Sequence, residues 1–212
     1  MPLVREGSMN YKLAYAVGFH PWEVAIDTPA FVEAITRLFE AEEEDRDPPY
    51  GRALDLGTGS GIWAVELAKR GWEVTGVDYV ESVLGRARDR AADAGVDVAF
   101  VHGDVTDLGA AGLEPGFRLV LDTGTYHGLT PDQRVGMGRE VDAVAGSDAT
   151  VLLLAWEPRR RGPLPRGATR EELAASFPGW EVSDLGRSEF SAPRPVELLM
   201  KPNEHWYRLR RE

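Results

Sequence analysis

The amino-acid sequence predicts an α/β fold in which a mostly parallel sheet carries helices on both faces. Short apolar segments typical of strands alternate with longer segments in which apolar residues recur at helical spacing. The segment from Thr150 to Ala155 is almost entirely apolar, as expected for a strand covered on both faces. Alternation of this kind specifies parallel strands joined by right-handed crossovers. No internal repeat or linker divides the 212 residues, so we expect one domain over residues 20–212.

The N-terminal part is expected to contain a tail followed by one helix. Residues 1–19 are predicted to be the tail, in which Gly7 and Ser8 before Met9 fit either a cloning remnant or a natural terminus. Apolar residues at helical spacing then predict a helix from Pro29 to Glu44, and an acidic stretch and two prolines end it.

The strands are predicted from short apolar or β-branched runs bounded by turn residues. The expected strands are Ala53–Leu56, Glu73–Val77, Val96–Val101, Phe117–Leu121 and Thr150–Ala155, with two further candidates near Trp180–Leu185 and Val196–Met200. His205 to Leu209 is expected to continue the final hairpin.

The helices between these strands begin and end at recognisable signals. The helix after the first strand is expected to end at Arg70, because Gly71 follows it. Capping boxes at Thr130 and Thr169 predict the starts of two later helices, the second running toward Phe177. The helix after the second strand has one apolar stripe, formed by Val80, Val83, Leu84, Ala87 and Ala91.

The run Asp55-Leu56-Gly57-Thr58-Gly59-Ser60-Gly61 joins the first strand to its helix. Glycines at such a turn let the backbone bend tightly and let a ligand approach the unpaired N–H groups at the helix N-terminus. The dinucleotide pattern G-x-G-x-x-G would place its third glycine at Ile62, and the G-K-[ST] of a Walker loop is absent. The run therefore predicts a nucleotide-cofactor loop of another kind.

This run, with Val77-Asp78 closing the next strand, resembles the class I S-adenosylmethionine (SAM) methyltransferases. The resemblance covers residues 20–200 and implies a Rossmann-like, doubly wound sheet of seven mostly parallel strands with an antiparallel C-terminal strand. It also implies that SAM is the cofactor and S-adenosylhomocysteine the product. Residues 122–127 have the pattern D-x-G-x-[FY]-H, which is similar to the segment after the fourth strand in small-molecule methyltransferases that act on thiols, halides or natural products.

The resemblance assigns the cofactor to the carboxyl ends of the strands. Asp78 is expected to accept hydrogen bonds from the ribose hydroxyls, Asp104 to contact the adenine amino group, and Asp122 to lie near the methionine part of SAM. The expected cofactor residues are Asp55, Gly57, Thr58, Gly59, Gly61, Trp63, Asp78, Tyr79, Gly103, Asp104, Val105, Asp122, Thr123 and Gly124.

Several of these positions also have a purely structural interpretation. Asp78 is suited to cap the helix that follows it, and Asp122 to cap a turn or helix. Gly103 and Asp104 form a dipeptide common in turns. Trp63 is at least as well suited to packing as to contacting the methionine group.

The acceptor side is expected to involve Trp22, Tyr126, His127 and Trp156. His127 is the candidate general base, because histidine takes up a proton near neutral pH, although a structural hydrogen-bonding role fits it as well. Trp22 lies in a P-W-[DE] segment similar to that of an N-terminal lid, predicted here over residues 20–48. Both Trp22 and Tyr126 are equally suited to packing.

A cluster of arginines follows the fifth strand, at Arg159, Arg160, Arg161 and Arg166. These side chains are suited either to recognise an anionic acceptor or to form a solvated loop. Thr125 stands where a cysteine is frequent in the related pattern, which speaks against a thiol or halide acceptor.

Composition narrows the classes of partner. The net charge of −11 repels a polyphosphate backbone, so we expect a small-molecule acceptor and no nucleic acid. No apolar stretch is long enough to span a membrane, so no membrane partner is expected. The absence of cysteine fits a reducing cytoplasm and excludes a thiolate metal site, and no metal is expected.

Together these features predict an enzyme that transfers a methyl group from SAM to a small molecule by in-line displacement. The alternatives are a SAM- or nucleotide-binding protein without turnover and, less favoured by the glycine spacing, an NAD-dependent oxidoreductase. The sequence does not identify the acceptor atom or the oligomeric state.

Overall fold

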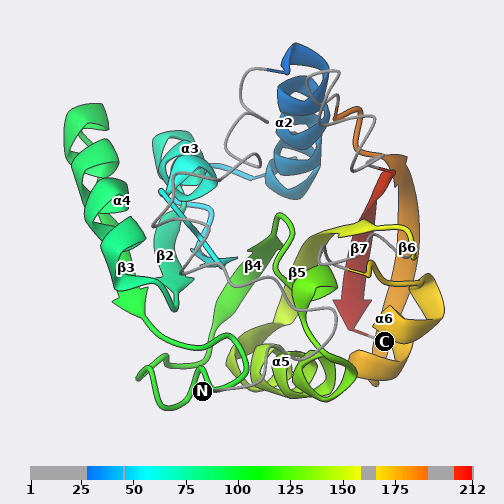
Figure 1. Cartoon of the computed structure of the whole chain (residues 1–212). Helices are drawn as coiled ribbons and strands as arrows, with labels where there is room; N and C mark the ends of the chain where they lie inside the picture. Colours follow the sequence, from blue (N-terminus) through cyan, green and yellow to red (C-terminus); the bar gives the residue numbers. More distant parts are fainter. Residues whose placement is uncertain (1–27, 45, 159–165, 191–202, 212) are drawn as a thin grey trace, which may run out of the picture.

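The chain forms a seven-stranded sheet with the order β3-β2-β1-β4-β5-β7-β6 (Figure 1). The computed structural model describes residues 28–44, 46–158, 166–190 and 203–211. The strands are β1 (Arg52–Leu56), β2 (Glu73–Asp78), β3 (Val98–His102), β4 (Phe117–Asp122), β5 (Ala145–Trp156), β6 (Trp180–Arg187) and β7 (Glu204–Arg211). The strand order reverses between β1 and β4, which is where such sheets bind ligands.

The pairing of the strands confirms the predicted fold class. β1 pairs in parallel with β2 and β4, β2 with β3, and β4 with β5. β7 runs antiparallel between β5 and β6. The residues from His205 to Leu209 lie in β7, as predicted, whereas the strand expected at Val196–Met200 falls outside the described residues.

Helices cover both faces of the sheet (Figure 1). One face carries α2 (Pro29–Glu43), α3 (Ile62–Arg70) and α4 (Glu81–Ala94), and the other carries α5 (Pro131–Val144) and α6 (Arg170–Ser176). The strands serve both layers because successive side chains point to opposite faces. On β4, Leu119 and Leu121 pack in the core under α2 and α3, whereas Val120 packs in the core under α5.

The predicted helix signals are present in the structure. The Thr130 hydroxyl accepts from the Gln133 backbone N–H, and the Gln133 side chain accepts from the Thr130 N–H, which completes a capping box on α5. Thr169 and Glu172 form the same arrangement on α6. Because each capping box joins residues only three apart, the starting points of both helices are determined locally. Both helices face the acceptor side of the predicted site.

Helix α2 is tied to the sheet by a buried carboxylate. Glu42 accepts a hydrogen bond from the Thr150 hydroxyl at 2.9 Å and forms an ion pair with Arg208 Nε at 2.9 Å. These partners lie on β5 and β7, so helix α2 is held to the half of the sheet that contains the antiparallel strand by polar contacts as well as by its apolar face.

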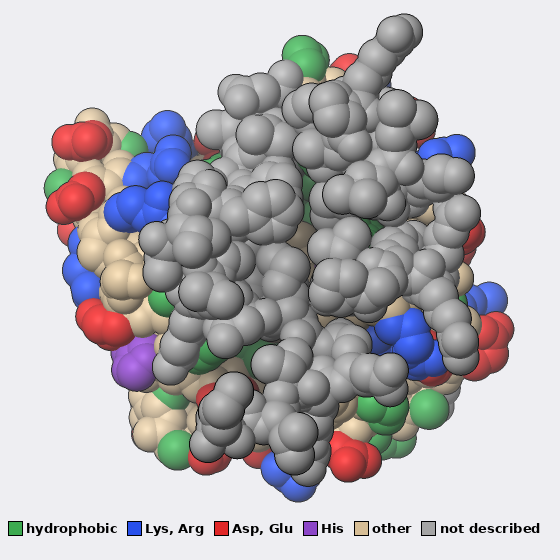
Figure 2. All heavy atoms as spheres, in the orientation of Figure 1, with side chains coloured by type: hydrophobic (Ala, Val, Ile, Leu, Met, Phe, Trp, Pro, Cys, Tyr) green, Lys and Arg blue, Asp and Glu red, His purple; other side chains and the backbone are tan. Residues whose placement is uncertain are grey.

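The surface has mixed charge. Acidic and basic side chains of the described residues both appear around the edges of the view in Figure 2. Within the parts of the chain that the structure describes, no helix is long and apolar enough to cross a membrane.

Helices α5 and α6 approach each other at a glycine, which makes Gly138→Ala a test of this packing. A Cβ at Gly138 would lie 1.8 Å from the Ser176 carbonyl oxygen, so we expect a loss of about 1–3 kcal/mol in the free energy of unfolding. The matched control is Gly136→Ala on the same helix, where a Cβ meets nothing closer than 3.5 Å.

In the control, the higher helix propensity of alanine should stabilise the protein by about 0.5–1 kcal/mol. Urea unfolding of the two variants measures both values. Equal effects of the two substitutions would contradict the close α5–α6 contact.

Candidate active site

Three buried carboxylates meet where the parallel strands end. Asp55 lies on β1, Asp78 ends β2 and Asp122 ends β4, and each is at most 6% exposed. Leu56 of β1 pairs with Asp122 on one side and with Val77 on the other, so the register places the three carboxylates at the same edge. The strand ends predicted from the sequence are therefore adjacent in space.

The glycine loop takes the shape that its sequence requires. Gly57, Gly59 and Gly61 have φ values of +66°, +54° and +75°, a region that other residues rarely adopt. A Cβ at Gly57 would lie 2.0 Å from Thr125 Oγ1, and one at Gly61 would lie 2.9 Å from the Ala87 Cβ. The packing of the chain itself thus requires glycine at two of these positions, in addition to any need of a ligand.

Asp55 is the least satisfied of the three carboxylates. Its Oδ2 accepts from the Thr58 hydroxyl at 2.7 Å, and its buried Oδ1 has no hydrogen-bond partner among the described residues. Burial raises the pKa of Asp55 to about 7, and the nearby charges of Asp122 and Asp78 act in the same direction. An unpaired buried carboxylate of this kind suits a cationic ligand.

Asp78 connects the glycine loop to the start of α4. Its Oδ2 accepts from the Gly59 backbone N–H at 2.9 Å, and its Oδ1 accepts from the Val80 N–H at 2.8 Å. Burial raises its pKa, and these hydrogen bonds oppose the increase. The prediction that Asp78 caps α4 is wrong, because Val80 is the N-cap and no side chain among the described residues caps the helix. Asp78 instead orders the backbone on both sides, and its carboxylate keeps further lone pairs for a ligand.

The segment after β3 forms a turn. Asp104 Oδ1 accepts from both the backbone N–H and the hydroxyl of Thr106, at 2.8 and 2.7 Å. The Gly103 N–H donates to the Asp78 carbonyl at 3.1 Å, which brings the turn beside the end of β2. Val105 is buried, and Tyr79 is 39% exposed.

Asp122 caps a short 3₁₀ helix, η2 (Tyr126–Gly128), that the sequence analysis did not predict. Its Oδ1 accepts from the N–H groups of Gly124 and Thr125 at 2.7 and 2.6 Å, and its Oδ2 accepts from the Tyr126 N–H at 2.8 Å. Burial raises the pKa of Asp122 to about 6, and the three hydrogen bonds oppose this. The carboxylate thus orders the segment from Thr123 onward.

His127 and Trp156 stack on each other at the ends of β4 and β5. Their ring centroids are 4.8 Å apart with an interplanar angle of 17°, and both side chains are buried. The Trp156 indole N–H donates to Glu204, which also accepts from the Ser188 hydroxyl. A Cβ at Gly124 would lie 3.1 Å from His127 Cε1, so the backbone lies close against the imidazole.

Tyr126 points away from this stack and into the core. Its side chain is fully buried, and its hydroxyl contacts the Glu172 carbonyl and the Ser176 hydroxyl at 3.0 and 2.8 Å. Of the two roles predicted for Tyr126, contact with the acceptor or packing, these surroundings fit packing.

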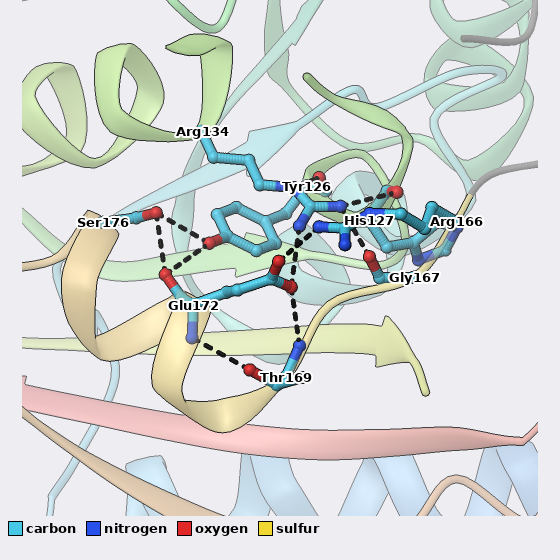
Figure 3. A network of polar contacts seen from close by, with 8 residues as sticks. All are labelled: Tyr126, His127, Arg134, Arg166, Gly167, Thr169, Glu172 and Ser176. Carbon is cyan, nitrogen blue, oxygen red and sulfur yellow. Dashed lines mark hydrogen bonds and ion pairs between the residues drawn. The ribbon is translucent and has the colours of Figure 1, made fainter. Parts of the chain in front are cut away.

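Sequence reasoning missed Arg134, a buried arginine on α5 that joins several elements (Figure 3). Its guanidinium donates to the carbonyl groups of Tyr126, His127 and Gly167 and to the Glu172 carboxylate. The available signal was its helical position, because Arg134 precedes the buried Met137 by three residues.

The other expected residues have varied surroundings. The Trp63 ring packs against Phe31, with centroids 5.8 Å apart. Arg166 forms an ion pair with Glu172. Trp22 and the three arginines at 159–161 lie outside the described residues.

Residues 53–147 match the family described as "Methyltransferase domain". The 2-heptyl-1-hydroxyquinolin-4(1H)-one methyltransferase of Mycobacteroides abscessus is 24% identical over 179 residues, covering 81% of this chain and 73% of that protein. The release factor glutamine methyltransferase of Deinococcus radiodurans is 36% identical over 117 residues, which is 52% of this chain and 41% of that protein.

Solved structures share the whole fold. The 1,6-didemethyltoxoflavin-N1-methyltransferase of Burkholderia thailandensis, with 1,6-didemethyltoxoflavin and S-adenosylhomocysteine bound, has a TM-score of 0.71 at 24% identity. The alignment covers 95% of this chain and 85% of that one. The chain is a SAM-dependent methyltransferase with the class I fold, and its match to the methyltransferase family covers residues 53–147. The cofactor of this methyltransferase is therefore SAM.

The residues of the methyltransferase fit this cofactor. SAM carries a sulfonium and an ammonium group, and Asp55 contributes a buried carboxylate oxygen without a partner among the described residues. Opposite charges attract strongly where water is excluded, so this carboxylate suits the cationic end of SAM. The described residues contain no group of three or more His, Cys, Asp or Glu side chains arranged to hold a metal ion.

The buried Asp55 predicts a pH-dependent stability of the methyltransferase. Its pKa is about 7 in the folded state against 3.8 ordinarily, so the folded protein holds this proton more tightly than the unfolded chain. Its contribution to the free energy of unfolding is thus complete below pH 3.8 and is lost as the pH rises to about 7. Asp55→Asn keeps an oxygen for Thr58 but cannot ionise.

Without SAM, the variant should melt above the wild type at pH 8, by about 2–4 °C for each kcal/mol of penalty removed, and close to it at pH 4. Scanning calorimetry at the two pH values measures the difference. The same variant should bind SAM more weakly at pH 8, where the wild-type carboxylate is charged. A melting difference that does not change with pH would contradict the assignment.

Proposed function

We propose that this methyltransferase transfers the methyl group of SAM to a small heteroaromatic molecule whose nucleophile is a hydroxyl oxygen or a ring nitrogen. The observation that carries the proposal is the buried stack of His127 on Trp156. It lies beside the edge of the sheet where the carboxylates of Asp55, Asp78 and Asp122 meet, which we call the cofactor edge. Related proteins support the acceptor class, because one is named for a hydroxyquinolinone and another holds a toxoflavin precursor.

The cofactor would be held by the glycine loop and the strand ends. In this proposal Asp78 binds the ribose hydroxyls, Asp104 and the Val105 backbone contact the adenine, and Asp55 stabilises the cationic end of SAM. Gly57, Gly59 and Gly61 keep side chains away from the helix N-terminus, where the cofactor lies. Asp122 acts indirectly, because its oxygens order the backbone of residues 124–126.

SAM, when bound, supplies a methyl group already activated on sulfur. The remaining work of the protein is to align the nucleophile with this methyl group and to exclude water, which accounts for large rate increases in oriented reactions. His127 is proposed to take the proton that a hydroxyl or ring N–H acceptor must release. The stacked Trp156 holds the imidazole ring in its plane.

An acceptor panel tests the proposed substrate class. Hydroxyquinolines, ring N–H heterocycles, phenols, amines, thiols and halides are incubated with the enzyme and SAM, and formation of S-adenosylhomocysteine is measured. We expect turnover with the heteroaromatic hydroxyl or N–H compounds. Turnover restricted to thiols or halides, or to a protein substrate, would contradict the proposal.

Two substitutions separate cofactor binding from the chemical step. His127→Ala should leave SAM affinity nearly unchanged and lower kcat by about 10²-fold or more, the usual loss for a general base. Asp78→Ala should instead weaken SAM binding, measured by titration calorimetry. His205→Ala is the matched control, because His205 lies at the start of β7 and pairs with Asp184.

The control variant should retain kcat. Unchanged turnover in His127→Ala would remove the proposed role of the base. Wild-type SAM affinity in Asp78→Ala would remove the ribose assignment.

A further inference from the structure

We infer that Arg134 is a positioning residue, which sets the place of His127 by holding the backbone of η2 from behind. The inference rests on the proposed function, since it gives His127 its purpose at the acceptor side. Arg134 does not belong to the cofactor edge and was not indicated by any motif.

The contacts of Arg134 are those of a buried anchor. The side chain is 3% exposed, and its guanidinium lies 5.0 Å from the centre of the Tyr126 ring. Nη2 donates to the His127 carbonyl at 3.1 Å and to the Gly167 carbonyl at 2.7 Å, and Nε donates to the Tyr126 carbonyl at 3.3 Å. Consecutive carbonyls of η2 are thereby held by one planar group.

The η2 turn is held by groups of opposite charge. Asp122 accepts from the N–H groups of Gly124, Thr125 and Tyr126 at the start of the turn. Arg134 donates to the carbonyls of Tyr126 and His127, the first two residues of η2, so the negative charge meets N–H groups of the turn and the positive charge meets its carbonyls. The contacts of Asp122 and Arg134 together fix the backbone that carries His127. In this inference the His127 ring stacks on Trp156 only while the turn keeps this geometry.

Glu172 on α6 supplies the negative charge that stabilises the buried guanidinium of Arg134. Its carboxylate accepts from Arg134 Nη1 at 3.1 Å and also pairs with Arg166. Burial lowers the pKa of Arg134, and the negative charge of Glu172 opposes this decrease. A buried cation without its partner is strongly destabilising, so α6 is bound to η2 through Arg134 (Figure 3).

The position of His127 matters for its proposed role, because a general base must lie within reach of the proton that it removes. A displacement of about 1 Å at a reacting group can cost about 10²-fold in rate. Loss of the guanidinium contacts should therefore lower kcat through His127 and leave the parts of the cofactor edge on β1 and β2, with Asp55 and Asp78, intact.

Arg134→Lys tests this inference with a readout that does not depend on activity. Lysine keeps the charge but cannot reproduce the planar set of donors. The ring of Trp156 should shift the His127 Cε1–H signal upfield in the proton NMR spectrum, and His127→Ala identifies that signal. In Arg134→Lys, with S-adenosylhomocysteine bound, we expect the signal to lose its upfield shift.

The variant should also lower kcat by about tenfold or more on the accepted member of the panel, while the Kd for SAM stays within about threefold. The matched control is Arg70→Lys, because Arg70 makes a similar part-buried pair with Glu43 between α3 and α2. The control should lose stability without moving the His127 signal or kcat.

Glu172→Gln provides a second variant in case Arg134→Lys does not fold. Glutamine keeps an oxygen for the capping box with Thr169 but removes the charge that balances Arg134, so the His127 signal should move in the same direction by a smaller amount.

An unchanged His127 signal and kcat in Arg134→Lys would overturn the inference. A parallel loss of SAM affinity and kcat in both Arg134→Lys and Arg70→Lys would also overturn it, because that result reflects stability alone. If His127→Ala keeps its turnover, the proposed base is wrong, yet the NMR shift still tests whether Arg134 positions the ring.

Discussion

The structure depends on how three negative charges are accommodated at one edge of the sheet. Asp55, Asp78 and Asp122 are buried side by side, and like charges in such a place are costly unless they are hydrogen-bonded. Asp122 accepts from three backbone N–H groups and Asp78 from two. Both carboxylates thereby order the loops that follow their strands.

Asp55 differs because its Oδ2 accepts one hydrogen bond, from the Thr58 hydroxyl, while its buried Oδ1 has no hydrogen-bond partner in the part of the chain that the structure describes. At this edge the carboxylates of Asp78 and Asp122 order the surrounding loops, whereas the charge of Asp55 remains to be balanced. In the proposed function a cationic cofactor balances this charge, so the same burial that lowers the stability of the protein without SAM would favour the binding of SAM.

In the proposed function, the two layers of helices serve different parts of the reaction. The face with α3 and α4 presents the glycine loop, where Gly61 is packed against Ala87 of α4. The opposite face, with α5 and α6, supports the η2 turn and His127 through Arg134 and Glu172. In this proposal the cofactor and acceptor functions depend on separate layers of helices, which meet at the sheet and at the contact between Gly57 and Thr125.

Much of the fold follows from short-range rules that the sequence states directly. The glycines with positive φ, the capping boxes at Thr130 and Thr169, and the stop at Gly71 each depend on a few neighbouring residues. The placement of aspartates at the strand ends also follows, because parallel strands present their carboxyl ends at one edge. Such features can be predicted because their causes lie within one turn of the chain.

What the sequence by itself determined is the order of the elements, the cofactor loop and the positions of its carboxylates. Only the tertiary structure decided which partners those carboxylates have, that Tyr126 points into the core, and that Arg134 is buried behind His127. Arg134 and Glu172 are 38 residues apart. The physical reason is that a buried charge is tolerated only through its partners, and these come together when the helices pack.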